Sequence, residues 1–226
     1  NDAVLTSNIN TVANLDVSGL NIADLTGIED FTALDTLSCG YNQLTNLDVS
    51  NNTALTSLGC SSNHLTTLDV SNNTALTDLN CSDNQLTSLD VSNNTALTTL
   101  HCEYNLLTSL DVSNNTALTH LDCDNNQLTS LDVSNNTALA LLYCHYNQLT
   151  SLDVRNGNNT NMTMFLADLN DSLYCIDVDD PVWSATNWTW GIDPWSSFSC
   201  SCGAPQTYVP DDNFETYLET NGMGNG

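Results

Sequence analysis

The sequence predicts a β-rich solenoid, a fold in which successive coils of one chain stack side by side along a common axis. The prediction rests on three columns of identical residues that recur every 21 positions through the middle of the chain. The columns are cysteines (Cys39, Cys60, Cys81, Cys102, Cys123, Cys144), asparagines (Asn42, Asn63, Asn84, Asn105, Asn126, Asn147) and aspartates (Asp48, Asp69, Asp90, Asp111, Asp132, Asp153). Each coil of such a fold buries its apolar residues against its neighbours, so the length of 226 residues counts coils rather than globular domains.

Each repeat begins with Leu-x-x-Leu-x-Cys-x-x-Asn-x-Leu, a pattern typical of leucine-rich repeats. Leucine and cysteine alternate with variable residues, which predicts a short strand with its variable residues on the surface. The strands are expected at residues 37–39, 58–60, 79–81, 100–102, 121–123 and 142–144, stacked in one parallel sheet. The rest of each repeat is rich in Thr, Val, Asn and Ser, which disfavour helix, so we expect extended segments and turns on the convex side.

The cysteine and asparagine columns are both expected to point inward, but with different roles. The ladder cysteines should be small buried apolar groups with unreactive thiols, because bridging all of them would force poor disulfide geometry along the stack. The asparagines should turn inward and bond the backbone of adjacent coils, since a buried amide needs partners.

The chain divides into four expected parts. Residues 1–34 form a less regular N-terminal coil, 35–154 six regular repeats, and 155–203 a degenerate coil with a C-terminal cap. All four tryptophans follow the degenerate coil and are expected to cover the open end of the solenoid: Trp183, Trp188, Trp190 and Trp195. One disulfide is expected in this part, between Cys175 and Cys202, with the partner of Cys200 left open.

The charge balance excludes several classes of partner. The chain has 27 acidic residues and a single base, Arg155, which gives a formal charge of −26. Nucleic acids and anionic membrane surfaces require a basic surface, so neither is an expected partner. No apolar run is long enough to span a membrane, and no signal peptide is visible.

Several segments together resemble a known class of proteins. The runs VLTSNIN, LTSLDVSNNTALTxLxC and CIDVDDPVWSATNW look like exported leucine-rich-repeat modules of surface proteins from Bacteroidetes-type bacteria, and NIADLTGIEDFTAL resembles the coils of internalins. The resemblance implies a non-catalytic protein, secreted or held on the cell surface, that serves adhesion or protein–protein recognition. It supplies no catalytic residues.

The variable positions of the later repeats form a candidate ligand-binding face. They are His101, Glu103, Tyr104, His120, Asp122, Asp124, Tyr143, His145 and Tyr146. Aromatic and polar groups on a rigid concave surface suit a protein or a glycan, although drift at exposed positions would give the same pattern. A transition-metal site among the histidines and carboxylates is an alternative. Glu103 and Asp124 approach the spacing of a glycosidase pair, but no enclosed cleft is implied, so we do not expect an enzyme.

Two outward columns allow further interpretations. The six aspartates of the Leu-Asp-Val segments stack about 4.8 Å apart, and each adjacent pair repels by about 0.9 kcal/mol in bulk water. Each carboxylate is expected either to accept a bond from a following amide or to share bridging Ca²⁺ with its neighbours, as in a calcium-dependent surface-layer protein. The threonine column raises ice binding as a further alternative: Thr45, Thr66, Thr87, Thr108, Thr129 and Thr150.

Residues 204–226 form an expected linker and helix. Residues 208–219 predict a short amphipathic helix with Phe214, Tyr217 and Leu218 on one face. In the proteins that the chain resembles, such a segment opens a module. We therefore expect head-to-tail docking of these residues on the first coil of a following unit, as in a tandem array or filament. The alternative is a boundary placed inside a larger protein.

Overall fold

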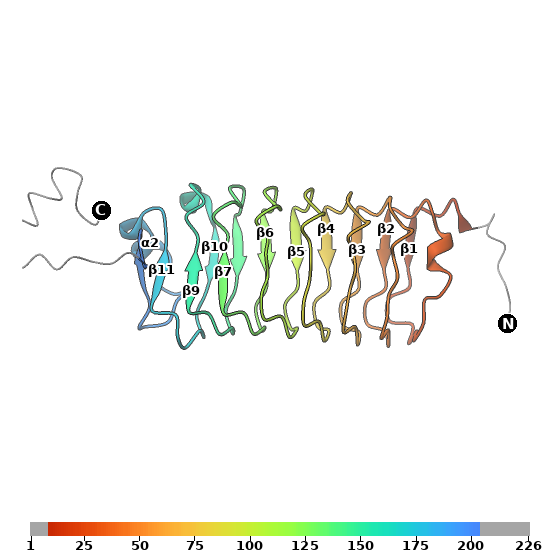
Figure 1. Ribbon diagram of the computed structural model, residues 1–226, viewed down its shortest axis with the longest axis horizontal. Helices are drawn as coiled ribbons and strands as arrows, with labels where there is room; N and C mark the ends of the chain where they lie inside the picture. The colour runs from red at the N-terminus through yellow and green to blue at the C-terminus, as the bar shows by residue number, and fades with distance from the viewer. Residues whose placement is uncertain (1–8, 204–226) are drawn as a thin grey trace, which may run out of the picture.

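The computed structural model describes residues 9–203, which form one elongated solenoid with its coils stacked along the long axis (Figure 1). The chain begins at one end of this axis and advances coil by coil to the other. The predicted leucine-rich-repeat solenoid is thereby confirmed. The expected helix at residues 208–219, with Phe214, Tyr217 and Leu218, lies outside the described residues.

The main sheet has eight parallel strands in the order β1-β2-β3-β4-β5-β6-β8-β10. Their bounds are β1 Asn14–Asp16, β2 Thr36–Ser38, β3 Ser57–Gly59, β4 Asp78–Asn80, β5 Thr99–His101, β6 His120–Asp122, β8 Leu141–Tyr143 and β10 Met164–Leu166. Each regular strand lies one residue earlier than expected. Its central leucine is fully buried and faces the leucine of the next coil, as Leu37 faces Leu58, while the flanking residues stay partly exposed.

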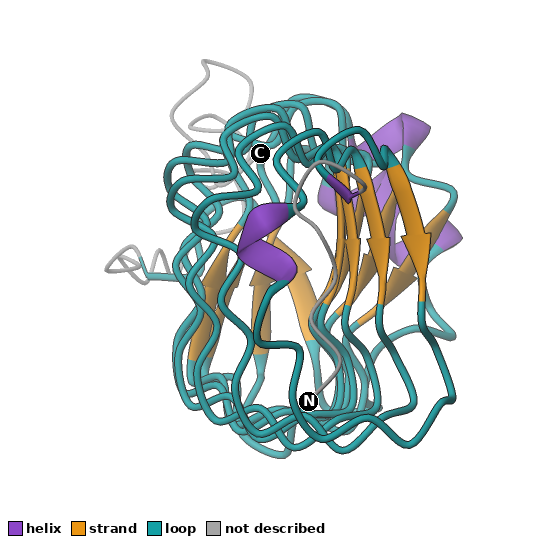
Figure 2. Ribbon diagram, turned by 90° about the vertical axis from the view of Figure 1, so that its right-hand side faces the viewer, coloured by secondary structure: helices purple, strands orange, loops and turns teal. Residues whose placement is uncertain are grey.

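A second sheet of four parallel strands lies on the opposite wall, as the view along the axis shows (Figure 2). Its order is β12-β11-β9-β7, with bounds β7 Ser130–Asp132, β9 Ser151–Asp153, β11 Cys175–Asp177 and β12 Ser197–Ser199. The return segments are thus extended, as expected, and in the C-terminal coils they also pair regularly. Short 3-10 helices occur at Ile28–Asp30 and Asn159–Asn161.

The two inward columns behave as the sequence predicts. All six ladder cysteines are fully buried without a disulfide, and burial raises the pKa of Cys39 to about 12. Asn63 accepts from the Leu44 amide at 2.9 Å, and its Nδ2 donates to the carbonyls of Cys39 and Cys60, both at 3.1 Å. One amide therefore links two coils, and the pattern repeats along the column.

A second asparagine ladder, which was not predicted from the sequence, runs along the return segments. Its members are the second asparagine of each Val-Ser-Asn-Asn-Thr: Asn52, Asn73, Asn94, Asn115 and Asn136, all fully buried. Asn73 donates from Nδ2 to the carbonyls of Val49 at 3.0 Å and Asn52 at 2.9 Å. The repeat period was the available signal, but asparagine is also a common turn residue.

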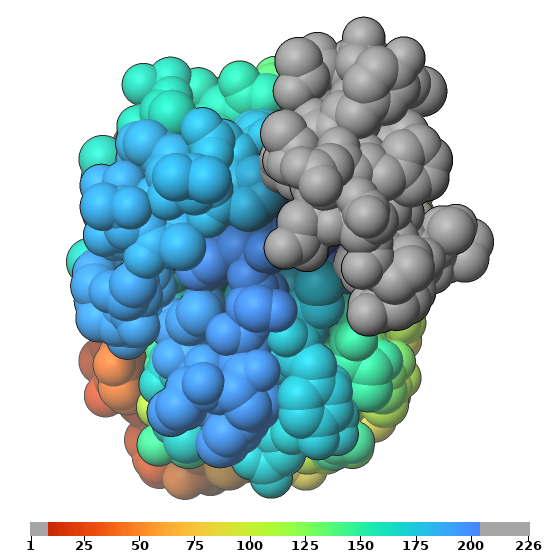
Figure 3. Space-filling view, turned by 90° about the vertical axis from the view of Figure 1, so that its left-hand side faces the viewer, coloured from red at the N-terminus to blue at the C-terminus, as the bar shows by residue number. Residues whose placement is uncertain are grey.

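The C-terminal end of the solenoid is closed by a cap (Figure 3). Helix α2, Pro181–Asn187, begins where Asp180 accepts bonds from two backbone amides, and it leads to Trp188. Trp188 is only 3% exposed and stacks on Phe165 with ring centroids 4.5 Å apart. The expectation that all four tryptophans cover the end is too broad, because Trp190 and Trp195 remain 59% and 47% exposed.

A disulfide in this part of the chain joins Cys175 on β11 to Cys202, the pair expected from the sequence. Arg155, the single base, bonds Asp153 and the carbonyl of Cys200 and also lies near Asp177. These links tie the last regular repeat to the cap.

Candidate ligand-binding surface

Strands β5, β6 and β8 present outward side chains that differ from the small groups of the earlier coils. The register of the sheet places His101 beside Asp122, and Asp122 beside Tyr143. We call the whole set the histidine–acid patch: His101, Glu103, His120, Asp122, Asp124, Tyr143 and His145. Successive side chains of a strand point to opposite faces of the sheet, so the regular parallel register gathers the outward residues of these coils into one area.

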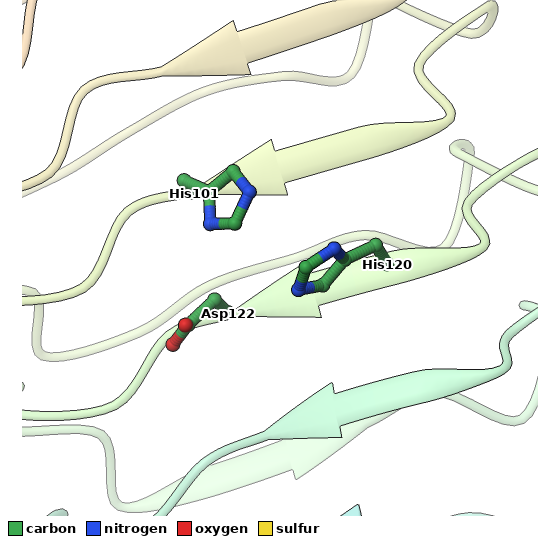
Figure 4. Close-up of side chains that lie close together, drawn as sticks. All are labelled: His101, His120 and Asp122. Atoms are coloured by element: carbon green, nitrogen blue, oxygen red, sulfur yellow. The ribbon is translucent and has the colours of Figure 1, made fainter. Parts of the chain in front are cut away.

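The side chains of the patch contact one another across the strands. The rings of His101 and His120 meet edge to face with centroids 4.6 Å apart, and His120 lies 5.6 Å from the ring of Tyr143. His145 Nε2 lies 3.1 Å from the Asp124 carboxylate. Figure 4 shows His101, His120 and Asp122 gathered over two neighbouring strands. The patch is therefore one connected cluster.

The electrostatics of the patch follow from partial burial beside like charges. Burial raises the pKa of the Asp122 carboxyl to about 8, and the neighbouring Asp124 and Glu103 add to the shift. The Glu103 carboxylate raises the pKa of His101, whereas burial and the neighbouring His101 lower the pKa of His120. The two adjacent imidazoles are thus held in different protonation equilibria, and the acidic patch carries less charge near neutral pH than its composition implies.

Several polar atoms of the patch are buried without a hydrogen-bond partner among the described residues. They are Glu103 Oε2, His120 Nε2, Asp124 Oδ1 and His145 Nδ1. Buried polar atoms in proteins nearly always have a partner, so these four have bonding capacity that a bound molecule or ion would meet. The Oδ1 atoms of the second asparagine ladder are unpartnered in the same way inside the solenoid.

The other two expected tyrosines lie beside the strands rather than on them. Tyr104 and Tyr146 occupy the turn that follows each strand, with φ of 54° and 50°, and they are 57% and 53% exposed. Together with Leu106 and Leu169 they line an open groove of about 510 Å³. We call these four residues the tyrosine ridge. Its two leucines were not predicted from the sequence, although Leu106 interrupts a column that holds glutamine in most repeats.

Tyr104 and Tyr146 have a left-handed backbone conformation that does not favour bulky residues. A positive φ strains a residue with a large side chain, whereas Asn and Asp tolerate it well, and the same turn position holds Asp83 and Asn125 in other coils. Residues with a strained backbone conformation are often found at functional sites. The ridge and the patch are adjacent in the chain, since Tyr104 follows Glu103 and Tyr146 follows His145.

The aspartate column satisfies its carboxylates locally. Asp48 accepts a bond from the Ser50 amide at 3.0 Å, and Asp69 accepts one from Ser71 at 2.9 Å. Bonding by the serine side chain, together with that by its amide, lowers the pKa of both carboxyl groups. The same bond occurs at Asp90, Asp111, Asp132 and Asp153. The turn interpretation accounts for the column, and bridging Ca²⁺ stays a prediction.

Within residues 9–203, the side chains that converge closely enough to hold a metal ion are His101, His120 and Asp122. The same residues contain no helix long and apolar enough to cross a bilayer.

Comparison with known proteins agrees with this architecture. Residues 7–115 match the family model described as the leucine-rich-repeat domain of the endo-beta-N-acetylglucosaminidase EndoS. A segment of 51 residues is 49% identical to internalin J of Listeria monocytogenes serotype 4b (strain F2365), and it covers 23% of this chain and 6% of internalin J.

Solved structures show the same fold. Internalin C2 of Listeria monocytogenes is 22% identical, with a TM-score of 0.70 over 87% of this chain and 83% of internalin C2. The leucine-rich-repeat ectodomain of the receptor kinase GASSHO1/SCHENGEN3 of Arabidopsis thaliana is 25% identical, with a TM-score of 0.59 over 64% of this chain and 19% of the ectodomain. The chain therefore has the leucine-rich-repeat fold, and part of its sequence is similar to an internalin.

Proposed function

We propose that this module is a non-catalytic, extracellular recognition protein that serves adhesion by binding a protein partner across the histidine–acid patch and the tyrosine ridge. The observation that carries the proposal is the pair Tyr104 and Tyr146. The turn takes a positive φ in each coil, and in these two coils it holds exposed aromatic side chains directly next to the patch residues Glu103 and His145. Aromatic residues beside polar groups with unmet bonding capacity are the composition of a binding surface.

A protein ligand fits the charge and shape of this surface. The groove is open rather than enclosed, which suits an extended chain, and the formal charge of −26 attracts basic partners. The Arabidopsis receptor ectodomain of similar fold is in complex with CASPARIAN STRIP INTEGRITY FACTOR 2. That complex supports a protein or peptide as the ligand class here. Association should slow as the salt concentration rises, because electrostatic steering is screened.

The surface is poorly suited to catalysis. Glu103 and Asp124 follow the adjacent strands β5 and β6, but Asp124 is engaged by His145 and the neighbouring groove is open to water. A glycosidase pair acts in an enclosed site that holds the sugar ring between the carboxyl groups. The ladder thiols are buried with raised pKa values, as at Cys39, which removes them as nucleophiles.

The chain supplies a matched control for testing the proposal. Tyr41 occupies the same turn position after β2, with φ of 55° and 72% exposure, and strands β3 and β4 separate β2 from the first strand of the patch, β5. Asparagine suits this conformation, so Tyr104→Asn, Tyr146→Asn and Tyr41→Asn should all leave the fold intact. Binding of ligands selected from a displayed library of extracellular proteins is measured for each variant by biolayer interferometry.

Loss of one ridge tyrosine should weaken binding by at least about tenfold, because exposed tyrosines at interface centres are frequent hot spots. Tyr41→Asn should bind like the unmodified chain. Ligands that bind equally well to all three variants would contradict the proposal. Hits on a glycan array that disappear with Tyr143→Ala would instead favour a glycan-binding module.

Head-to-tail assembly is a separate proposal. It depends on Phe214, Tyr217 and Leu218, which lie outside the described residues. Sedimentation velocity at rising concentration should show growing species for the full chain and monomers for Leu218→Asp.

A further inference from the structure

We propose that His101, His120 and Asp122 form a binding site for one divalent transition-metal ion on the outer surface of the main sheet. This site goes beyond the recognition function proposed above and does not depend on it. One ligand atom from each of the three side chains lies within 4.8 Å of the other two. Figure 4 shows the two imidazoles and the carboxylate rising together from β5 and β6.

The register of the sheet produces this arrangement. His101 is the direct neighbour of Asp122 across the β5–β6 pair, and His120 lies two residues before Asp122 on the same face of β6. Donors around a tetrahedral ion with bonds of about 2.1 Å are about 3.4 Å apart. The three donor atoms therefore need to approach one another by at most about 1.4 Å, which rotation of the side chains provides without moving the strands.

The bonding state of the surrounding groups favours an ion. His120 Nε2 is buried and has no hydrogen-bond partner within the described part of the chain, so a metal would supply the missing contact. Glu103 Oε2, which also has no hydrogen-bond partner there, lies 3.6 Å from His101 Nδ1. Metal-binding histidines commonly have a carboxylate in this place, where it orients the ring.

The donor set and the local charge indicate the class of ion. Two imidazole nitrogens with one carboxylate oxygen suit Zn²⁺, Co²⁺, Ni²⁺ or Fe²⁺, whereas Ca²⁺ and Mg²⁺ prefer oxygen ligands throughout. Asp122 on β6 lies near two further carboxyl groups, those of Glu103 just after β5 and Asp124 just after β6. The single base, Arg155, pairs with Asp153 instead. A dication would relieve this repulsion. Three protein ligands leave further coordination positions open to water or a partner's side chain.

Calorimetric titration tests the site directly with the metal alone. The full chain is stripped with EDTA, exchanged into metal-free buffer and titrated with Zn²⁺, and one ion per chain should bind with micromolar or tighter affinity. His120→Asn and Asp122→Asn should each weaken Zn²⁺ binding by at least about 100-fold, and Glu103→Gln by about tenfold, as expected for an orienting group. His64→Asn is the matched control, because His64 is exposed and lies in an early coil.

Spectroscopy of the unmodified chain gives a second readout that needs no variant to fold. Bound Co²⁺ should show the intense visible absorption of a four- or five-coordinate ion with nitrogen ligands, and added Zn²⁺ should remove it. The proposal is overturned if Zn²⁺ gives no saturable heat, or if its affinity is unchanged by both His120→Asn and Asp122→Asn. A drop in affinity with His64→Asn alone would place the ion elsewhere. None of these outcomes bears on the recognition function, which is tested with the tyrosine variants.

Discussion

The second asparagine ladder makes a sharp prediction, because the two asparagines of one Asn-Asn pair have opposite environments. Asn94 is fully buried and donates to the carbonyls of Val70 at 3.0 Å and Asn73 at 2.9 Å. Its neighbour Asn93 is exposed and reaches the Ser71 carbonyl at 3.3 Å. Asn93→Ala should change the free energy of unfolding by no more than about 0.5 kcal/mol.

Asn94→Ala should be clearly destabilising. It removes two buried hydrogen bonds, each of which contributes about 1 kcal/mol net. The two carbonyls keep one backbone donor each, since Asn73 N bonds Val70 O and Leu76 N bonds Asn73 O. Both carbonyls therefore stay bonded. The substitution also removes Asn94 Oδ1, which is buried without a hydrogen-bond partner among the described residues, so the expected loss is at most about 2 kcal/mol.

Asn105→Ala, in the first ladder, should cost more. Asn105 Oδ1 accepts from the Leu86 amide at 2.9 Å, and Nδ2 donates to the carbonyls of Cys81 at 3.0 Å and Cys102 at 3.2 Å. Among the described residues, this Oδ1 is the only acceptor of the Leu86 N–H. An orphaned buried donor costs about 1–3 kcal/mol, and with the two lost bonds the total is about 4 kcal/mol.

Urea unfolding followed by circular dichroism measures the three effects on one scale. The loss of stability should increase from Asn93→Ala to Asn94→Ala and again to Asn105→Ala. Equal losses for Asn93→Ala and Asn94→Ala would refute the assignment of the second ladder as a buried structural element. A neutral Asn105→Ala would refute the claim that one amide links two coils.

Three further predictions concern the cap, the patch and the cysteines. Gly191→Ala should lower the melting temperature strongly, because a Cβ there would lie 2.0 Å from the Phe165 carbonyl, whereas Gly203→Ala faces open space and serves as its control. Asp122 has a folded-state pKa of about 8, above its unfolded value of about 3.9, so it destabilises the fold as the pH rises from about 4 to 8; Asp122→Asn should reduce that loss in melting curves at pH 5 and pH 8. The six ladder thiols should resist an aqueous thiol reagent until the chain unfolds, and their labelling in native protein, detected by mass spectrometry, would contradict their burial.

The periodic part of the fold could be predicted because each position repeats one environment. A leucine or cysteine that recurs at a fixed period beside variable neighbours has one explanation, burial between coils, and this holds for Leu58 and Cys60 alike. The burial of Asn52 was harder to predict, because asparagine in a turn and asparagine in a buried ladder look the same in a sequence. Pairing in the second sheet was also hidden, since similar Leu-Asp segments occur in coils that pair there and in coils that do not.

The candidate site could be predicted where strand alternation applied and not where the backbone turns. Alternation placed His101, Asp122 and Tyr143 on one face, and the register places them side by side. Tyr104 and Tyr146 were expected on the same face, but their left-handed turn directs them to the edge beside it. The alternation rule ends with the strand, because its two-residue period depends on extended backbone.

The contrast between early and late coils separates what the fold requires from what it does not. Strand β3 carries Ser57 and Gly59 outward, yet its central leucine is as fully buried as that of β5, which carries His101. The same stacking contacts therefore form whether the outward residue is small or bulky. Partly buried, mutually repelling carboxyl groups such as that of Asp122 oppose folding rather than assist it. The patch is thus a feature that the stacked coils tolerate, and the rigid ladders beneath it hold its imidazoles, carboxylates and tyrosine in place.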